Sequence, residues 1–439
     1  MEPINIIFGP WRPDAGNMES GFSRAARNVV PVLGGGFTSI LPAEQYSTST
    51  SLTASTHTVC GGFSSENRDE TEDFIGTITH LFRVSSGNAA IRDASRTTGG
   101  AYNTNKTAST DAFWDFCQFG DFTIAVNGAH ASLADDPQVF QSLVSSNFAA
   151  LAGSPPRAQT VASISEFVVM GNTFDSTDGV RPTRVWWSAF ADHTSWTPNP
   201  ATQAGFQDLV TGAGPIVRIV SGGDFGFVIC ERSVFVMEYE GPPTVFRFRE
   251  LKGVGCQAPL TVVLIGESVY FYSTHGFVKV NRDRSWEPIG AGKIDKTAAH
   301  QNAIRTYGFV GAEDKYNQGV TWLYDRDGTA GDCYFYHLPS KEWSEDATKT
   351  GAQFIWSSRL ATLKNIFGTT VDESQQSTVY WVDVERNGAT SFGDGHVYAN
   401  TNIGECAAIS LTSSYEQLYP GHKTFVREVQ PILVSAIRS

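Results

Sequence analysis

The chain has 439 residues, a formal net charge of −13 at pH 7, and only 18% charged residues against 12% aromatic ones. This acidic balance argues against a general binder of nucleic acid or of anionic membranes, because Lys and Arg hold such partners. The aromatic content and the 42 glycines disfavour disorder and suit many short strands joined by tight turns.

The amino terminus lacks the features of an export signal. Met1–Asn5 has neither a basic start nor an apolar stretch, and no apolar run approaches the roughly 20 residues of a membrane span. We therefore expect a protein that is made in the cytoplasm and does not insert into a membrane.

Residues 1–45 read as an extended N-terminal arm. Phe8, Trp11 and Pro13 lie among Gly and Pro residues that fit neither a helix nor a central strand. The side chains of Phe8 and Trp11 still need to be buried against other residues. They either pack back onto the body of the same chain or dock on a neighbouring subunit, and we take Phe8, Trp11 and Pro13 as a candidate intersubunit contact.

Residues 46–112 are rich in Ser, Thr, Asn and Gly, which predicts long loops between strands at residues 80–84 and around Ile91. A stronger β signal begins at Phe113. From there an acidic turn followed by an apolar strand recurs at Asp121, Glu166, Asp224 and Glu267. Their spacing is near the repeat of about 40 to 50 residues that is typical of propeller blades.

Three further β units follow, at residues 304–343, 354–384 and 425–437, and a short helix is expected between Asp136 and Ala150. The pattern predicts an all-β protein, a β-propeller of about six blades, give or take one, over residues 46–439. A two-sheet sandwich with a second β domain is the structural alternative.

No motif in the chain specifies a metal, a cofactor or a catalytic nucleophile. The six cysteines lie far apart, which favours reduced core thiols, and the nine histidines form no HxH or HExxH pattern. The sequence contains no GxSxG elbow, Walker loop or GxGxxG fingerprint. We therefore expect no enzyme activity and no bound metal or cofactor.

Two sets of residues are compatible with a protein that cleaves or binds sugars. Propeller glycosidases use paired acids, and the candidates here are Asp135, Asp136, Glu231, Glu238, Glu240, Asp372 and Glu373. These acids are isolated among turn residues, so turn roles explain them more simply. Trp196, Trp286 and Trp343 each end a unit, and they either form a sugar-stacking surface or staple one blade to the next.

Several blocks of the chain resemble one known family. Phe8-Gly9-Pro10-Trp11-Arg12-Pro13-Asp14 and Gly34-Gly35-Gly36-Phe37 are similar to the amino-terminal signature of the packaged-DNA stabilisation proteins of short-tailed bacteriophages. Further blocks are similar to that family in the same order. They are residues 155–158, 182–189, 206–209, 241–244, 253–259 and 288–295.

This resemblance implies a β-propeller tail hub, also called a tail accessory factor or nozzle. Copies would form a ring of six below the portal and its adaptor. The ring would prolong the DNA channel, retain the packaged genome and carry the distal needle, fibres or spikes. The protein would reside in the virion tail, DNA would pass through it without specific binding, and the resemblance carries no catalytic residues.

An acidic inner face would suit such a channel, because it repels DNA that must slide without sticking. The alternatives are a propeller-fold glycosidase or depolymerase and a lectin-like receptor-binding protein. Propellers usually close by pairing their first and last strands, and the end of this chain at Ser439 within a strand-like run leaves that closure open.

Overall fold

The fold is described from a computed structural model. It describes residues 8–16, 21–40, 43–45, 59–67, 70–85, 88–98, 101–102, 113–301, 308–325, 331–346, 352, 354–358, 379–382, 397–400 and 410–413.

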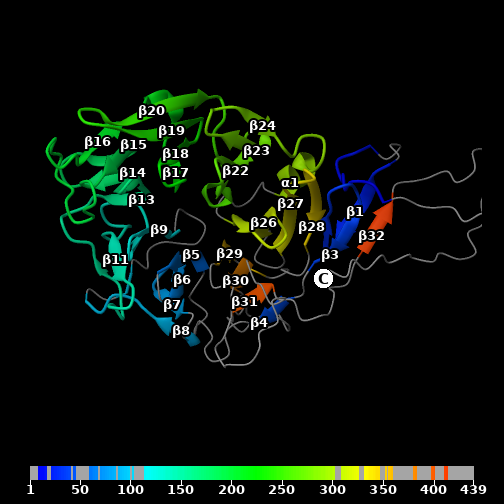
Figure 1. Cartoon of the computed structure of the whole chain (residues 1–439), viewed down its shortest axis with the longest axis horizontal. Coiled ribbons are helices and arrows are strands. Elements are labelled where there is room, and N and C mark those ends of the chain that lie inside the picture. The colour runs from blue at the N-terminus through cyan, green and yellow to red at the C-terminus, as the bar shows by residue number, and fades with distance from the viewer. Residues whose placement is uncertain are drawn as a thin grey trace, which may run out of the picture.

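Seven short strands form a closed ring at the centre of the molecule (Figure 1). Each begins one sheet and contacts the first strand of the next, and the last contacts the first. These strands are β5 (Val59–Glu66), β9 (Asp115–Phe119), β13 (Arg157–Ile164), β17 (Ile216–Ser221), β21 (Val263–Ile265), β25 (Phe309–Asp314) and β29 (Phe354–Ser357). The ring excludes the two-sheet sandwich.

Three more strands extend each sheet outward, and we number the resulting blades 1 to 7 in chain order. Within the described residues, six sheets have four strands and one has six, which confirms the predicted β-propeller. The second strands are β6 (Thr71–Thr77), β10 (Phe122–Val126), β14 (Phe167–Asp175), β18 (Phe225–Cys230), β22 (Ser268–Ser273), β26 (Gly319–Asp325) and β30 (Val379–Val382). The third strands are β7 (Leu81–Ser85), β11 (Gln138–Gln141), β15 (Gly179–Trp187), β19 (Ser233–Gly241), β23 (Gly276–Asn281), β27 (Gly331–His337) and β31 (Val397–Asn400). The fourth strands of blades 1 to 6 are β8 (Asn88–Asp93), β12 (Ala149–Ala150), β16 (Gly205–Asp208), β20 (Val245–Lys252), β24 (Trp286–Pro288) and β28 (Glu342–Glu345).

The N-terminal segment supplies strands to the last two blades. β4 (Ala43–Gln45) pairs with β31 and is the outer strand of blade 7. β1 (Ser23–Arg27) pairs with β28 of blade 6 and with β32 (Ser410–Ser413). β2 (Val29–Pro31) and β3 (Phe37–Ser39) form a separate hairpin. The described part of residues 1–45 is therefore not an arm distinct from the propeller, since a strand from near the amino terminus completes blade 7.

The segment expected to form a short helix between Asp136 and Ala150 is instead β-structure. β11 pairs with β10, and β12 pairs with β11. Phe140 and Phe148 are both buried and contact Phe74 of blade 1 at 5.2 and 5.3 Å between ring centroids. Burial between two blades thus overrides the local pattern. Within the described residues the α-helix is α1 (Asp295–Gln301), and short 3-10 turns lie at Thr211–Ala213 and Pro259–Thr261.

The apolar core lies between neighbouring blades. One cluster joins blades 4 and 5 through residues such as Phe227 and Phe271, and another joins blades 2 and 3. Buried indoles add directional bonds from blade to blade, since Trp343 Nε1 donates to the Ile289 carbonyl at 3.0 Å and Trp322 Nε1 to the Thr261 carbonyl at 2.9 Å. The stapling interpretation therefore holds for Trp343, whereas Trp286 is 39% exposed.

Five cysteines are free and buried, as the sequence predicted: Cys60, Cys117, Cys230, Cys256 and Cys333. Burial raises the pKa of the Cys230 and Cys256 thiols to about 12. Both thiols therefore stay neutral and act as small core residues. Cys406 lies outside the described residues.

Two adjacent carboxylates on β6 tie blade 1 to the blades on either side of it. Successive side chains of a strand point to opposite faces. Glu72 accepts a hydrogen bond from Ser142 of blade 2 at 2.6 Å, and Asp73 accepts one from Ser358, which follows β29 of blade 7, at 2.6 Å. Burial raises the pKa of both carboxyls, that of Asp73 to about 7. Asp73 thus lies at the closure of the ring.

Asp73 should make the stability of the propeller depend on pH. Because its folded pKa of about 7 lies above the ordinary value of 3.8 for an aspartate, the folded state binds the proton more tightly and gains stability as pH falls through 7 toward 4. We expect Asp73→Asn to abolish this gain and to stabilise the protein at pH 8.5 by roughly 1–4 kcal/mol. Urea unfolding at pH 5.5 and 8.5 measures both quantities. An unchanged pH profile in the variant would contradict the assignment.

Candidate functional site

Trp11 is buried within its own chain. Its side chain is 4% exposed, its Nε1 donates to the Arg24 carbonyl at 3.1 Å, and its ring stacks on Tyr334 of blade 6 at 6.4 Å. Of the two alternatives left open by the sequence, packing onto the chain's own body is the one observed for Trp11. Phe8 and Pro13 are half-buried, and their contact with a neighbour stays a prediction.

The segment around Trp11 is fastened to blades 5 and 6. The carboxylate of Asp14 accepts hydrogen bonds from the backbone N–H groups of Lys296 and Thr297 at 2.8 and 3.0 Å, and from the Thr297 hydroxyl at 2.8 Å. Asp14 also donates its own N–H to the Lys293 carbonyl at 3.2 Å. An acidic side chain at the first turn of α1 is favourable, because the free N–H groups there need acceptors. The segment is therefore part of the folded body.

The four acidic residues that repeat in the sequence occupy equivalent places in the fold. Asp121, Glu166, Asp224 and Glu267 lie in the turns that join the first and second strands of blades 2, 3, 4 and 5, and all four are exposed. Glycines with positive φ precede three of them, as tight hairpin turns require. Because successive strands alternate in direction, these turns lie at the same end of the propeller.

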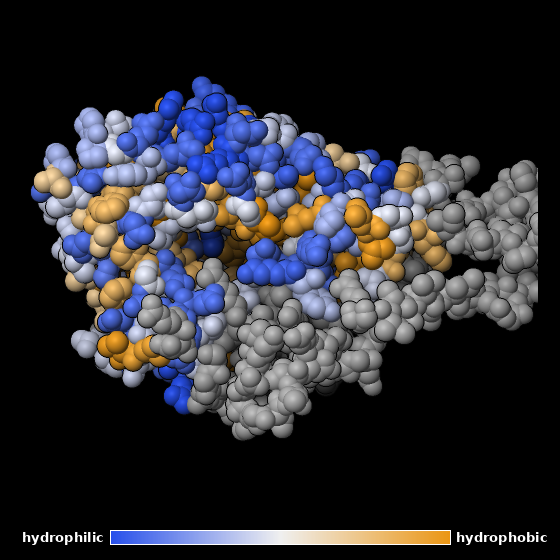
Figure 2. Space-filling view, viewed as in Figure 1, coloured by the Kyte–Doolittle hydropathy of each residue, from blue (hydrophilic) through white to orange (hydrophobic). Residues whose placement is uncertain are grey.

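This end of the propeller therefore carries four exposed carboxylates on neighbouring blades. Figure 2 shows one face of the propeller, which is hollowed near its centre. Arg282 neutralises part of the charge on these carboxylates, since its guanidinium pairs with Asp224 at 3.1 Å and with Glu267 at 3.2 Å. Asp121 and Glu166 form no ion pair with any described residue. The uncompensated negative charge is therefore centred on blades 2 and 3.

A buried charge pair links the first strands of three consecutive blades. Asp115 of β9 accepts hydrogen bonds from the Thr160 hydroxyl and the Val161 N–H of β13 at 2.5 and 3.0 Å. Arg218 of β17 reaches across to Asp115 at 2.9 Å. Burial raises the pKa of Asp115, while Arg218 and these hydrogen bonds act in the opposite direction. This pair could not be predicted from the sequence, because the two residues are far apart along the chain.

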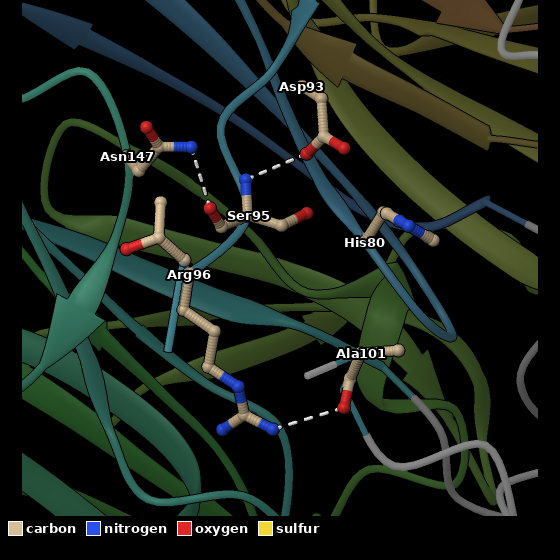
Figure 3. Close-up of a pocket in the computed structure, with 7 residues that line it drawn as sticks. His80, Asp93, Ser95, Arg96, Ala101 and Asn147 are labelled. Carbon is tan, nitrogen blue, oxygen red and sulfur yellow. Dashed lines mark hydrogen bonds between the residues drawn. The ribbon is translucent and has the colours of Figure 1, made fainter. Parts of the chain in front are cut away.

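A polar cavity of about 340 Å³ opens beside blade 1 (Figure 3). Its walls come from the turn before β7, the segment after β8, and the end of the loop before β12. The lining residues are His80, Asp93, Ser95, Arg96, Thr97, Ala101 and Asn147.

Most polar groups of this cavity already bond to one another. Asn147 Nδ2 donates to the Ser95 carbonyl at 2.7 Å, the Ser95 N–H donates to Asp93 at 2.8 Å, and Arg96 pairs with Asp135 at 3.0 Å. The guanidinium of Arg96 also lies over the Tyr102 ring. The volume of the cavity lies at the lower end of the range for small-ligand sites. The sequence did not predict this cavity.

The structure does not bring the candidate glycosidase acids together. Asp135 and Asp136 pair with Arg96 and Arg157 beside blade 2. The other described candidates belong to blade 4, where Glu238 pairs with Arg249 at 2.7 Å and Glu240 with Arg247 at 3.1 Å, and Glu231 lies in the turn between β18 and β19. Asp372 and Glu373 lie outside the described residues. Among the described carboxylates, those named form no facing pair across a pocket.

Among the residues that the structure describes, no group of three or more His, Cys, Asp or Glu side chains has the geometry to hold a metal ion. No described helix is long and apolar enough to cross a membrane.

Comparison with known proteins gives similarity to solved structures only. No protein-family model matches the chain, and a search of curated proteins gave no match. The chain is similar to the WD40 domain of Neurospora crassa Pan2, at 7% identity and a TM-score of 0.44, covering 83% of this chain and 97% of that one.

Two other structures show weaker similarity. One is a functionally unknown protein from Desulfotomaculum acetoxidans DSM 771, at 12% identity and a TM-score of 0.41, with 70% of this chain and 90% of that one covered. The other is a chain of a Nidogen/Laminin complex, at 10% identity and a TM-score of 0.34, with 60% and 90% covered. Such values carry no inference about function.

Proposed function

We propose that this chain is a structural component of a phage virion, a tail hub or nozzle ring. Copies of it continue the DNA channel below the portal and its adaptor, retain the packaged genome, and anchor the distal needle, fibres or spikes. In this role the protein is not an enzyme. It binds DNA only transiently and without sequence preference as the genome passes.

The observation that carries the proposal is the set of exposed carboxylates on equivalent turns of blades 2 to 5. Asp121, Glu166, Asp224 and Glu267 place negative charge at one end of the ring. A surface of this sign repels the phosphate backbone and limits adhesion of passing DNA. The ordered sequence blocks, from Phe8–Asp14 through residues 288–295, support the same family of proteins by resemblance.

The cavity in Figure 3 favours a second candidate, a lectin-like receptor binder. Its open position beside blade 1, its mixture of carboxylate, amide and guanidinium groups, and the neighbouring Tyr102 ring suit the hydroxyl groups and apolar face of a sugar. In this case the protein would bind a surface polysaccharide reversibly as an isolated chain.

One measurement distinguishes the two candidates. We expect light scattering to give the mass of a ring, either for the protein alone or after it is mixed with the portal and adaptor proteins of its phage. A chain that stays monomeric with those partners and binds host polysaccharide in isothermal titration would overturn the tail-hub proposal in favour of the lectin-like one.

A further inference from the structure

Two exposed surfaces of opposite charge lie on opposite sides of the propeller. In Figure 1, β24 of blade 5 is at the top near the middle and β28 of blade 6 is to the right, whereas β11 and β16 of blades 2 and 3 are on the left. The distribution of lysine follows this division. Residues 113–251, which are described without a gap, contain no lysine, while Lys252, Lys279, Lys293, Lys296, Lys315 and Lys341 all follow.

The first surface, which we name the basic edge, consists of Arg12, Lys279, Trp286, Lys293 and Lys341. The edge is continuous, because Lys279 and Lys341 both approach Glu287, at 3.8 and 3.7 Å, and the Lys293 ammonium donates to the Lys341 carbonyl. Trp286 is 39% exposed, and Lys341 extends 64% of its side chain into solvent.

The basic edge holds more cations than its acids compensate. Glu287 and Glu342 are the two carboxylates paired with its lysines, against four cationic side chains. Burial and the nearby charges of Arg12 and Lys341 lower the pKa of Lys293, with Glu342 acting in the opposite direction. A partner that brings further carboxylates would relieve this repulsion.

The second surface, which we name the acidic corner, consists of Asp121, Leu143, Glu166, Phe190 and Asp192. Three contacts hold its parts together. Ala191 donates its N–H to the Glu166 carbonyl at 2.8 Å, Ser142 donates its N–H to the Asp121 carbonyl at 3.0 Å, and the rings of Phe122 and His193 lie 4.2 Å apart. The corner therefore spans blades 2 and 3.

The acidic corner combines charge with apolar surface. Leu143 is 59% exposed and Phe190 is 47% exposed, both large fractions for apolar side chains. Leu143 also has a φ of 60°, a region that branched residues rarely adopt. Hydrogen bonds from Thr194 lower the pKa of Asp192, and burial lowers the pKa of the adjacent His193. At neutral pH the corner is therefore negative.

We propose that copies of this chain associate side by side, with the basic edge of one copy docked on the acidic corner of the next. Each surface offers an aromatic anchor, Trp286 or Phe190, surrounded by charges of opposite sign to those of its partner, as specific interfaces do. Trp286 and Phe190 both lie close to the end of the propeller where the third and fourth strands of a blade join. Two copies in the same orientation can therefore bring these surfaces together. Different patches on opposite sides of one subunit form a heterologous contact, which gives a ring when the rotation from copy to copy closes and an open filament when it does not. This inference rests on the proposed function, whose ring requires some contact between copies. In the ring Asp121 and Glu166 belong to this contact, so Asp224 and Glu267 are the turn carboxylates left to face the DNA.

Carbodiimide cross-linking of a mixture of isotopically light and heavy protein tests the contact directly. This reagent joins amines to carboxylates that touch. We expect light–heavy peptides that link Lys279 or Lys341 to Asp121, Glu166 or Asp192. If the protein assembles but its light–heavy links fall elsewhere, the inference is overturned and the proposed function stands.

A charge exchange provides the second test. The variants Lys279→Glu with Lys341→Glu, and Asp121→Lys with Asp192→Lys, should each weaken self-association by about 10- to 100-fold in low salt. An equimolar mixture of the two should restore association, because each reversed surface then meets the other. Lys252→Glu, which changes an 82% exposed lysine outside the basic edge, should leave association unchanged.

Light scattering at 50 and 300 mM salt measures these effects, and circular dichroism shows whether each variant folds. If neither double variant alters association, or if their mixture fails to restore it, another surface joins the copies. A wild-type chain that is monomeric at every concentration and gives no light–heavy link overturns this inference and also removes the ring on which the proposed function depends.

Discussion

Replacing Trp11 with Ala should lower the free energy of unfolding by about 3–5 kcal/mol, the usual cost of deleting a large buried aromatic side chain. The indole is 4% exposed, stacks on Tyr334 and donates to the Arg24 carbonyl. Its loss leaves a cavity between the N-terminal segment and blade 6, together with an unpaired carbonyl. Urea unfolding followed by circular dichroism measures the change.

Leu33 provides a matched control in the same N-terminal segment. It is 74% exposed, so Leu33→Ala should change stability by no more than about 0.5 kcal/mol. If Trp11→Ala were as mild as Leu33→Ala and instead weakened self-association, the intersubunit interpretation of Trp11 would be correct after all.

Replacing Arg218 with Met should be comparably damaging, by about 3–5 kcal/mol, because it leaves the Asp115 carboxylate buried without its counter-ion. Asp115 is 2% exposed, and Arg218 is its partner at 2.9 Å. Urea unfolding measures the loss. The double variant Asp115→Asn with Arg218→Met should recover most of it, because the neutral amide has no charge to bury and keeps an oxygen for the Thr160 hydroxyl.

The effect of Arg218→Met should also depend on pH. Burial already raises the pKa of Asp115, and removal of the guanidinium raises it further. The folded variant therefore binds a proton more tightly than the unfolded chain does, so its deficit relative to wild type should shrink as pH falls from 8 to 5. A deficit that is constant over this range would mean that lost packing, rather than lost charge pairing, explains the damage.

The repeated pattern of strands and acidic turns in the sequence was sufficient to predict a propeller. At Asp121, Glu166, Asp224 and Glu267 the sequence shows a strand pattern, then a turn of Gly or Ser with an acidic residue, then a second strand pattern. These four places correspond to the first hairpins of four consecutive blades. Local chemistry decides these features, because tight hairpins need particular turn residues and half-buried strands need β-branched and aromatic ones. Local chemistry was misleading at residues 136–150, where a helix was expected. The segment forms strands instead, because Phe140 and Phe148 pack against blade 1.

The candidate sites were less accessible from sequence. Residues 46–112 read as loops, yet β5 to β8 make up a whole blade there, because polar residues such as Glu72 and Asp73 are buried through hydrogen bonds to neighbouring blades. The cavity beside blade 1, the pair of Asp115 with Arg218, and the two opposed charged surfaces combine residues from different blades. No spacing along the chain marks them.

The sequence alone determined the all-β class, the blade repeat, the buried reduced state of five cysteines and the acidic residues of the repeated turns, because these depend on composition and on neighbours along the chain. Only the tertiary structure decided that Trp11 is a core residue, that β4 completes the last blade, and that Asp73 joins the ring's two ends. Each of these depends on a contact between residues far apart in sequence, where burial between blades outweighs local preference.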